Sequence, residues 1–261
     1  PTATESVAHS ASAEKTSQPV TDNAEASRPL TPSEQYRALR EGAEEEARRH
    51  VAALQEKARQ KRHQRALERA EIPALYREAS FDDYKAITDG ERFAKKVAEH
   101  YAEHFVTRRD RREDNSRNLI FHGRSRCGKT HLGCAIARSV MGMGYTAVVA
   151  KMSTILVECR DSYNREDVSE SSVMSRYINA DLLVLDEVGS ETSGSAEFRR
   201  SKIDYIIDER TEAMRPTVVI SNGLYTELQQ RLGTRSFNRI VEHGEPPVTF
   251  DWQPYRHRQT N

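Results

Sequence analysis

From Asn118 to Ile220, short apolar runs alternate along the chain with longer segments that have the spacing of amphipathic helices. The runs are Leu119–Phe121, Ala147–Val149, Leu182–Leu185 and Val218–Ile220. Apolar runs separated by helices are typical of strands buried on both faces of a parallel sheet. The sequence therefore predicts an α/β fold with helices on both faces of a parallel sheet. The helices expected beside the runs are Lys129–Val140, Ile155–Ser162 and Phe198–Thr211.

The first apolar run leads directly into the string Gly123-Arg-Ser-Arg-Cys-Gly-Lys-Thr130 and then into an expected helix. This string is the G-x-x-x-x-G-K-[ST] phosphate-binding loop in its strand–loop–helix setting. Its backbone N–H groups and the positive end of the helix surround a phosphate. Lys129 is expected to reach the β- and γ-phosphates, and the Thr130 hydroxyl to ligate Mg²⁺. The expected nucleotide contacts are Gly123, Arg124, Ser125, Arg126, Cys127, Gly128, Lys129, Thr130 and His131.

Two carboxylates, Asp186 and Glu187, come directly after the third apolar run. In this position Asp186 is expected to hold the magnesium through water, and Glu187 to orient and polarise the water that attacks the γ-phosphate. After the fourth run, Asn222 lies at a strand end, where its side chain can touch that water or the γ-phosphate. A simple turn residue is the alternative for Asn222. Together these residues predict a nucleoside triphosphatase.

The N-terminal part of the chain has a different composition. Residues 1–31 are mostly small and polar, with too few large apolar side chains to offset the entropy of ordering, so we expect a disordered tail. Residues 32–71 are rich in Glu, Arg, Ala and Leu, which predicts a long helix. Beyond a break at 73–84, Glu91–Phe105 has helical spacing, and the charged segment Arg108–Arg117 is expected to be a loop.

Apolar residues of the N-terminal helix recur at intervals of three and four and form one narrow stripe. A thin stripe on a helix otherwise covered with charge suits a groove on another protein or a coiled-coil seam. A solvated helix lying on its own domain is the alternative. The expected partner-binding residues are Tyr36, Leu39, Ala43, Val51 and Leu54.

Composition excludes several classes of protein. The 40 basic and 40 acidic side chains cancel, so bulk charge gives no argument for nucleic-acid binding. No apolar run approaches the roughly 18 residues of a membrane helix, and residues 1–31 lack the apolar core of a secretory signal. We therefore expect no membrane partner. The three cysteines have no C-x-x-C pairing, which favours a reducing cytoplasm over a disulfide framework or a zinc site.

Taken in order along the chain, these motifs resemble the bacterial DnaC-type replicative helicase loaders, members of the AAA+ ATPases grouped with DnaI and IstB proteins. The resemblance covers most of the chain, from Ile72 to Arg258. It implies a RecA-like ATPase core over residues 72–261 without a substantial lid, and ATP and Mg²⁺ as cofactors. The segments that carry it are Ser80–Tyr84, Gly123–Leu132, Asp181–Gly189, Arg215-Pro216, Ser221-Asn222 and Phe250–Arg256.

The resemblance also implies partners. In this family an N-terminal helical segment, here residues 32–71, grips a hexameric replicative helicase of the DnaB type, and the ATPase core engages single-stranded DNA. The core is expected to self-associate when bound to the helicase. We therefore expect an ATP-dependent helicase loader acting in replication initiation or restart.

Several single residues take roles from the family pattern. Asn222 matches the sensor-one polar residue, Arg239 the arginine finger that reaches a neighbouring subunit's ATP, and Arg256 the sensor-two arginine. Arg160, Tyr163 and Phe198 fall where family members contact single-stranded DNA, and aromatic rings there can stack on bases. Ordinary packing is the alternative for Tyr163 and Phe198.

The phosphate-binding loop departs from the family pattern, because Ser125-Arg126-Cys127 stands where Pro-Gly and a small residue are usual. Arg126 lacks the conformational freedom of glycine. We expect nucleotide binding to survive this change and turnover to be the step that it affects. Two alternative functions stay open: an IstB-like transposition ATPase that engages a transposase on duplex DNA, and a non-catalytic helicase-binding adaptor.

Overall fold

The structure is a computed structural model that describes residues 31–69, 72–110, 117–190 and 194–254. Residues 1–30 of the tail expected at 1–31 lie outside these residues, and so does Arg256. The chain divides into two units between Ala53 and Leu54, inside helix α1 (Pro32–Arg69). The α1 helix confirms the long helix expected from the sequence. The expected domain boundary at residue 71 stays a prediction.

Within the described residues, five parallel strands form one sheet in the order β2-β3-β4-β1-β5. Strand β1 pairs with β4 from Leu119↔Val218 to His122↔Ser221, and with β5 from Phe121↔Val248. The phosphate-binding strand therefore lies between two strands that come much later in the chain. The strands are β1 (Leu119–Gly123), β2 (Ala147–Lys151), β3 (Leu182–Asp186), β4 (Thr217–Ser221) and β5 (Val248–Phe250).

Successive side chains of a β-strand point to opposite faces of the sheet, so each strand contributes to two hydrophobic cores, one on each face. Leu119 and Phe121 pack on one face of the sheet, and Ile120 packs on the other. Leu182 and Leu183 of β3 divide in the same way. Because both faces are buried, most positions of these strands are apolar, which is the pattern the sequence showed, and polar residues such as His122, Lys151 and Asp186 stand at or near the strand ends.

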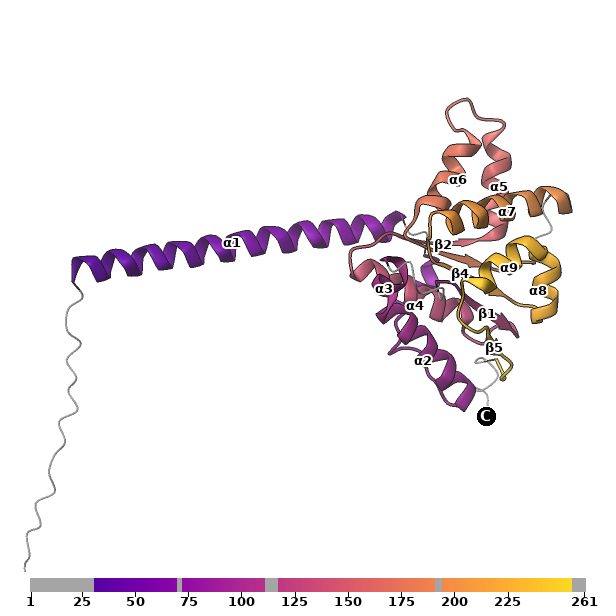
Figure 1. Ribbon diagram of the computed structural model, residues 1–261, viewed down its shortest axis with the longest axis horizontal. Helices are drawn as coiled ribbons and strands as arrows, with labels where there is room; N and C mark the ends of the chain where they lie inside the picture. Colours follow the sequence, from indigo (N-terminus) through magenta and orange to yellow (C-terminus); the bar gives the residue numbers. More distant parts are fainter. Residues whose placement is uncertain (1–30, 70–71, 111–116, 191–193, 255–261) are drawn as a thin grey trace, which may run out of the picture. The chain divides into compact units, whose positions relative to one another are not determined.

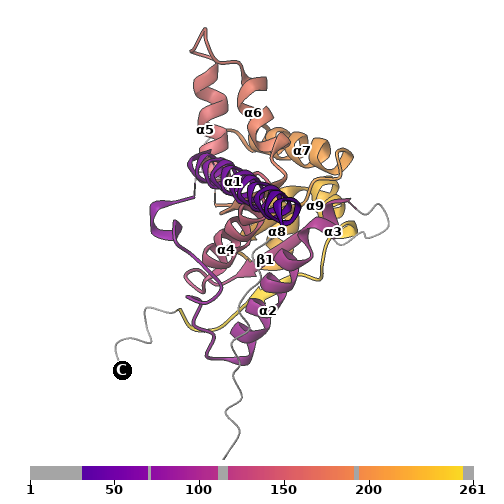
Figure 2. The same cartoon turned by 90° about the vertical axis from the view of Figure 1, so that its left-hand side faces the viewer.

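Helices cover both faces of the sheet (Figure 1). One face is covered by α2 (Asp89–Glu103) and α4 (Lys129–Gly142). The other face carries α5 (Met152–Ser162), α6 (Glu170–Asn179), α7 (Ala196–Glu212), α8 (Tyr225–Leu232) and α9 (Thr234–Glu242). Figure 2 shows α5 and α6 side by side, with α7 next to α6, and these helices are in contact. The predicted α/β fold with a doubly covered parallel sheet is confirmed.

Side-chain caps fix where several of these helices begin. Thr88 and Glu91 form a capping box at the start of α2, in which each side chain accepts a hydrogen bond from the other residue's backbone N–H. Ser169 and Ser195 cap α6 and α7 with their side chains. The Ser195 cap sets the beginning of α7, the helix that carries the candidate nucleic-acid contact Phe198.

The structure corrects the sequence-based expectations at several elements. The segment expected to be a loop at Arg108–Arg117 begins inside helix α3 (Phe105–Asp110). The sequence predicted no helix or strand after Val218–Ile220, where the structure has helices α8 and α9 and strand β5. Helix α6 and the short 3₁₀ helix η1 (Ala74–Tyr76) were also not predicted. In the described part of the chain, none of the helices has the length and apolar character that crossing a membrane requires.

Candidate nucleotide-binding site

The phosphate-binding loop joins β1 to α4, and two glycines make its path possible. Gly123 has φ 120°, and a Cβ there would lie 2.4 Å from the carbonyl oxygen of Phe250. Gly128 has φ 92°, and its Cβ would lie 2.6 Å from the Tyr84 ring. Residues other than glycine rarely adopt these backbone angles, and a side chain at either position would not fit in the space available. Both motif glycines are therefore required by the local geometry.

Lys129 is buried at the first turn of α4, and its ammonium faces the loop. Its Nζ donates to the carbonyl oxygen of Gly123 at 3.0 Å and to that of Arg124. Burial lowers the pKa of Lys129 to about 8, against the opposing effect of Cys127 and Asp186. A buried cation whose partners are loop carbonyls is a poorly compensated charge. Phosphate oxygens would neutralise it, so this residue fits a nucleotide triphosphate.

Thr130 and Asp186 meet across the end of the sheet. The Thr130 hydroxyl donates to Asp186 Oδ2 at 2.9 Å, which brings together two residues separated by 56 positions in the chain. Asp186 is buried, and desolvation raises its pKa although Thr130 and the Glu187 backbone hold the anion. A nearby cation would stabilise this carboxylate. The hydroxyl and carboxylate oxygens are the hard donors that Mg²⁺ prefers, so the pair fits that ion.

Glu187 follows Asp186 at the end of β3, in the left-handed backbone region with φ 55°. Its Oε1 lies 2.9 Å from Nζ of Lys151, the last residue of the neighbouring strand β2. The hydrogen bond to Glu187 raises the pKa of Lys151. The expected water-orienting carboxylate is thus engaged by a lysine in this structure. Asn222 is exposed just beyond β4, at the same edge of the sheet.

Residues distant in the sequence hold the loop from outside. The backbone carbonyl of Cys127 accepts from Trp252 Nε1 at 3.1 Å and from the Tyr84 hydroxyl at 3.4 Å. The buried Cys127 thiol donates to the Trp252 carbonyl at 3.1 Å. His131 bonds the Ser80 carbonyl through Nε2 at 2.8 Å. Of the other expected contacts, Arg124, Ser125 and Arg126 are exposed on the loop.

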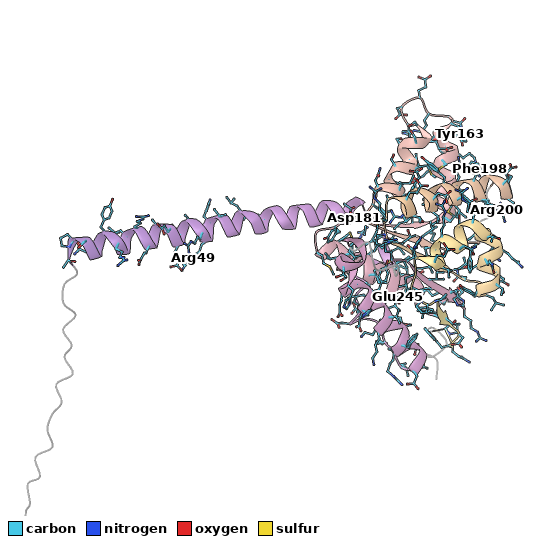
Figure 3. The ribbon with its side chains drawn as sticks, viewed as in Figure 1. Arg49, Tyr163, Asp181, Phe198, Arg200 and Glu245 are labelled. Carbon is cyan, nitrogen blue, oxygen red and sulfur yellow. The ribbon has the colours of Figure 1, made fainter. Side chains whose placement is uncertain are left out.

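Two of the three expected nucleic-acid contacts are labelled in Figure 3: Tyr163 directly after α5, and Phe198 in the first turn of α7. The third, Arg160, lies on α5. A Cβ on Gly194 would lie 2.9 Å from the Phe198 ring and 3.4 Å from Arg160 Nη2, so both of these side chains lie next to Gly194. Lys202 Nζ lies 5.1 Å from the centre of the Phe198 ring. Lys202 also pairs with Glu170, which accepts from the exposed Tyr163 hydroxyl. The structure thus brings Arg160, Phe198 and Tyr163 into one connected cluster.

Arg239 lies on α9, a helix in contact with α7 and α8. Its guanidinium pairs with Asp208 of α7, which also pairs with Arg235. The structure therefore assigns a carboxylate partner to the expected arginine finger. The stripe residues on α1 are exposed by between 51% and 76% at Tyr36, Leu39, Val51 and Leu54, and Ala43 is exposed as well.

No local sequence pattern marks Lys151 or Asp208 as a site residue. Lys151 pairs with a residue 36 positions away, and only the register of β2 against β3 brings the two together. Asp208 is one of several charged residues on a mostly polar helix. A periodicity argument cannot find either residue, because the pairing depends on the tertiary arrangement.

The comparisons with known proteins agree with this site. The model of the IstB-like ATP-binding protein family matches residues 31–259. The replicative helicase loader DnaC of Escherichia coli K12 is 30% identical over 209 residues, which are 80% of this chain and 82% of the loader. DnaC of Buchnera aphidicola from Schizaphis graminum is 29% identical over 194 residues, 74% of this chain and 75% of the relative.

Solved structures share the fold. A crystal structure of the DnaC helicase loader matches with a TM-score of 0.59 and 21% identity over 69% of this chain and 100% of that chain. The replication initiator DnaA bound to AMPPCP and single-stranded DNA matches with a TM-score of 0.56 and 16% identity, over 70% of this chain and 52% of that chain. The family match and the DnaC relatives, together with the phosphate-binding site, show that the chain belongs to the IstB-like ATP-binding proteins of the AAA+ class and, among them, to the DnaC-type helicase loaders.

Proposed function

We propose that this helicase-loader ATPase holds a hexameric replicative helicase through α1 and single-stranded DNA through its ATPase core, and that bound ATP sets the DNA-engaged state. The observation that carries the proposal is the intact set Lys129, Thr130, Asp186 and Glu187 at one sheet edge. This set occurs in a chain that covers 82% of a DnaC loader. A scaffold has no physical need for all four residues.

The geometry of the site supports the hydrolytic roles that we propose for its residues. Lys129 and the loop N–H groups bind the phosphates, which places the γ-phosphate near the ends of β3 and β4. Thr130 and Asp186 would hold Mg²⁺, which neutralises phosphate charge when bound. Once the Glu187 carboxylate has separated from Lys151, it orients the attacking water. Asn222, at the end of the next strand, contacts that water or the γ-phosphate. The Lys151 pair and Arg126 both favour slow turnover in the free protein.

Slow turnover is compatible with loading. A loader that holds a helicase ring open needs two conformations whose relative stability changes between the ATP-bound and the ADP-bound protein. It does not need many turnovers. Arg239 supplies positive charge to a neighbouring subunit's ATP, so hydrolysis depends on assembly of the cores on the helicase. The DnaA structure, which has the same fold over 52% of its chain, is bound to single-stranded DNA, and this supports the proposal of a DNA contact. Phe198 and Tyr163 would stack on bases while Arg160 holds the backbone.

The test of the helicase contact is light scattering after size exclusion, with this protein and the replicative helicase of its own organism. The double variant Leu39→Glu/Leu54→Glu changes two stripe residues that are exposed by 73% and 54%, so the helix should keep its structure. We expect it to lose the complex. Arg48→Glu is the matched control, because it shifts the net charge by the same amount at an exposed position beside the stripe. Equal complex formation by both variants would remove the stripe as the contact.

The test of the ATP-gated step uses Lys129→Ala in the same mixtures with Mg²⁺-ATP and single-stranded DNA. We expect loss of ATP binding and of ATP-dependent DNA retention, with the helicase contact unchanged. A complex that retains DNA equally well without ATP binding would favour the non-catalytic adaptor. If no helicase complex forms under any nucleotide condition, a transposase on duplex DNA becomes the partner to test.

A further inference from the structure

A single carboxylate on α7 faces two arginines of α9. Nη2 of Arg235 lies 2.5 Å from Oδ2 of Asp208, and Nη1 of Arg239 lies 2.9 Å from Oδ1. The Asp208 side chain is exposed by 18% and that of Arg239 by 26%, whereas Arg235 is exposed by 65%. The Asp208–Arg239 pair is therefore the more sheltered of the two, and its charges are less screened by solvent.

The contact between Asp208 and Arg239 is an ion pair. Among the described residues, the buried Oδ1 has no aligned hydrogen-bond donor, although Arg239 Nη1 is 2.9 Å away. Arg239 is thus held by charge attraction and not by a linear hydrogen bond. A guanidinium has five N–H donors, so the remaining donors stay available to an incoming anion. The carboxylate fixes the direction of Arg239 without using up its hydrogen-bonding capacity.

The rest of α9 is anchored independently of this pair. Phe237 and Ile240 are buried in the core beneath the helix. The Ser236 hydroxyl donates to Asp204, which lies one turn before Asp208 on α7. Loss of the Asp208 charge should therefore leave the helix in place and free only the end of the Arg239 side chain. The effect of such a change on packing and its effect on the arginine can be separated.

We propose that Asp208 is a positioning residue for Arg239, which holds the guanidinium in the orientation that meets the triphosphate of a neighbouring copy. The inference rests on the proposed role of Arg239 as the finger that acts across the subunit boundary. An arginine that is not held samples many rotamers, and a small misplacement of a transition-state contact lowers rates by roughly 10- to 100-fold. Asp208 contacts no substrate itself; it acts through Arg239.

The experiment measures ATP hydrolysis by the full chain assembled on the replicative helicase with single-stranded DNA. Asp208→Asn keeps the shape of the side chain and removes its charge. We expect a fall in kcat of about 10-fold or more, with the KM for ATP and the melting temperature near those of the unmodified protein. Asp204→Asn is the matched control, because it removes the same charge from the same helix and also touches α9. Its hydrolysis should stay close to normal.

Mixed assemblies test whether the defect crosses the subunit boundary. Glu187→Gln chains are expected to bind ATP without hydrolysing it, and they carry an intact Asp208–Arg239 pair. Mixed with Arg239→Ala chains, they should restore hydrolysis at the sites of those chains. They should restore Asp208→Asn chains in the same way. Adding Asp208→Asn to Arg239→Ala should cause no further loss, because both changes act on one group.

Each contrary result has a separate meaning. If Arg239→Ala hydrolyses ATP normally, the proposed finger is wrong and the inference falls with it. If Arg239→Ala is defective and is restored in the mixture while Asp208→Asn is fully active, the finger stands and only the inference is overturned. Failure of the mixture to restore Asp208→Asn, or an equal defect in Asp204→Asn, would show that the α7–α9 packing is responsible instead.

Discussion

At the scale of single residues, Arg126 has a backbone conformation that residues other than glycine seldom adopt. Its φ is 64°, in the left-handed region, at the loop position where the family pattern has a small residue. A non-glycine residue there costs roughly 1 kcal/mol. The loop backbone is therefore slightly strained directly before Cys127 and Gly128. The carbonyl of Cys127 and the backbone turn at Gly128 both shape the phosphate-binding loop.

Replacing Arg126 with glycine should relieve that strain. We expect Arg126→Gly to raise the free energy of unfolding in urea by up to roughly 0.5 kcal/mol, because the greater freedom of glycine in the unfolded chain offsets at least half of the strain that is relieved. Arg124→Gly is the matched control, since Arg124 is an exposed loop arginine without a positive φ. It should lower stability. A loss of stability in both variants would contradict the interpretation of Arg126.

The buried thiols give a second prediction at this scale. Burial is the main cause that raises the pKa of Cys134 to about 12 and that of Cys159 to about 11. A raised thiol pKa disfavours the thiolate, which forms only as the pH approaches that value. At pH 8 the thiolate fraction at Cys159 should be about 100-fold below that of an ordinary thiol. Iodoacetamide labelling followed by peptide mass spectrometry should therefore modify these cysteines in urea and spare them in the folded protein.

The residue scale also shows what a sequence can and cannot identify. Lys129, Thr130, Asp186 and Glu187 were predictable because a fixed local spacing defines each motif. The contact of Thr130 with Asp186 confirms that the two motifs meet. Lys151 and Asp208 were not predictable, because nothing in their local sequence distinguishes them from solvated charges. Their partners are defined by strand register and helix packing.

At the scale of helices and strands, Arg210 joins three elements. It is fully buried on α7, and its guanidinium donates to the carbonyl oxygens of Tyr177, Ile178, Ala180 and Pro216 and to the Thr217 hydroxyl. Two of these acceptors, the carbonyl oxygens of Tyr177 and Ile178, belong to the last turn of α6, where backbone carbonyls have no partner N–H within the helix. The arginine therefore satisfies the end of α6 and ties it to the start of β4.

Arg210→Met should be strongly destabilising. It removes the donor from several buried carbonyls, and we expect a loss of about 3–5 kcal/mol in the free energy of unfolding. Arg215→Met is the control: Arg215 bonds the same Ile178 carbonyl and the Asn179 side chain from a partly exposed position. Its cost should be about 1 kcal/mol. Equal costs in chemical denaturation would mean that burial of Arg210 is not what matters.

Element prediction succeeded where apolar patterning was strong. Strands β1 to β4 are buried on both faces along most of their length, so each contains an apolar run that could be found in the sequence. Strand β5 has only three residues, Val248–Phe250, and follows two prolines, so it carried too little pattern. Helices α8 and α9 are short and rich in polar residues, and each buries only two or three side chains. Tertiary packing fixes these elements more than their own sequences do.

At the scale of the whole molecule, the strand order makes the nucleotide site depend on the C-terminal part of the chain. A chain that ends at residue 216 would keep the phosphate-binding loop, Asp186 and Glu187 but would lack β4 and β5. Both hydrogen-bonded neighbours of β1 would be missing. We expect this truncated chain to show neither a cooperative unfolding transition nor binding of a fluorescent ATP analogue. Retention of binding would show that the loop forms without its sheet neighbours.

The same strand order has a consequence for synthesis on the ribosome. Leu119 pairs with Val218, so β1 leaves the exit tunnel about a hundred residues before its first partner, and β5 arrives later still. The nascent chain therefore carries a complete phosphate-binding sequence before either strand that flanks it in the sheet has been made. ATP capture becomes possible only after β4 and β5 have emerged. A ribosome-released fragment would carry the nucleotide motifs without competing for the cell's ATP.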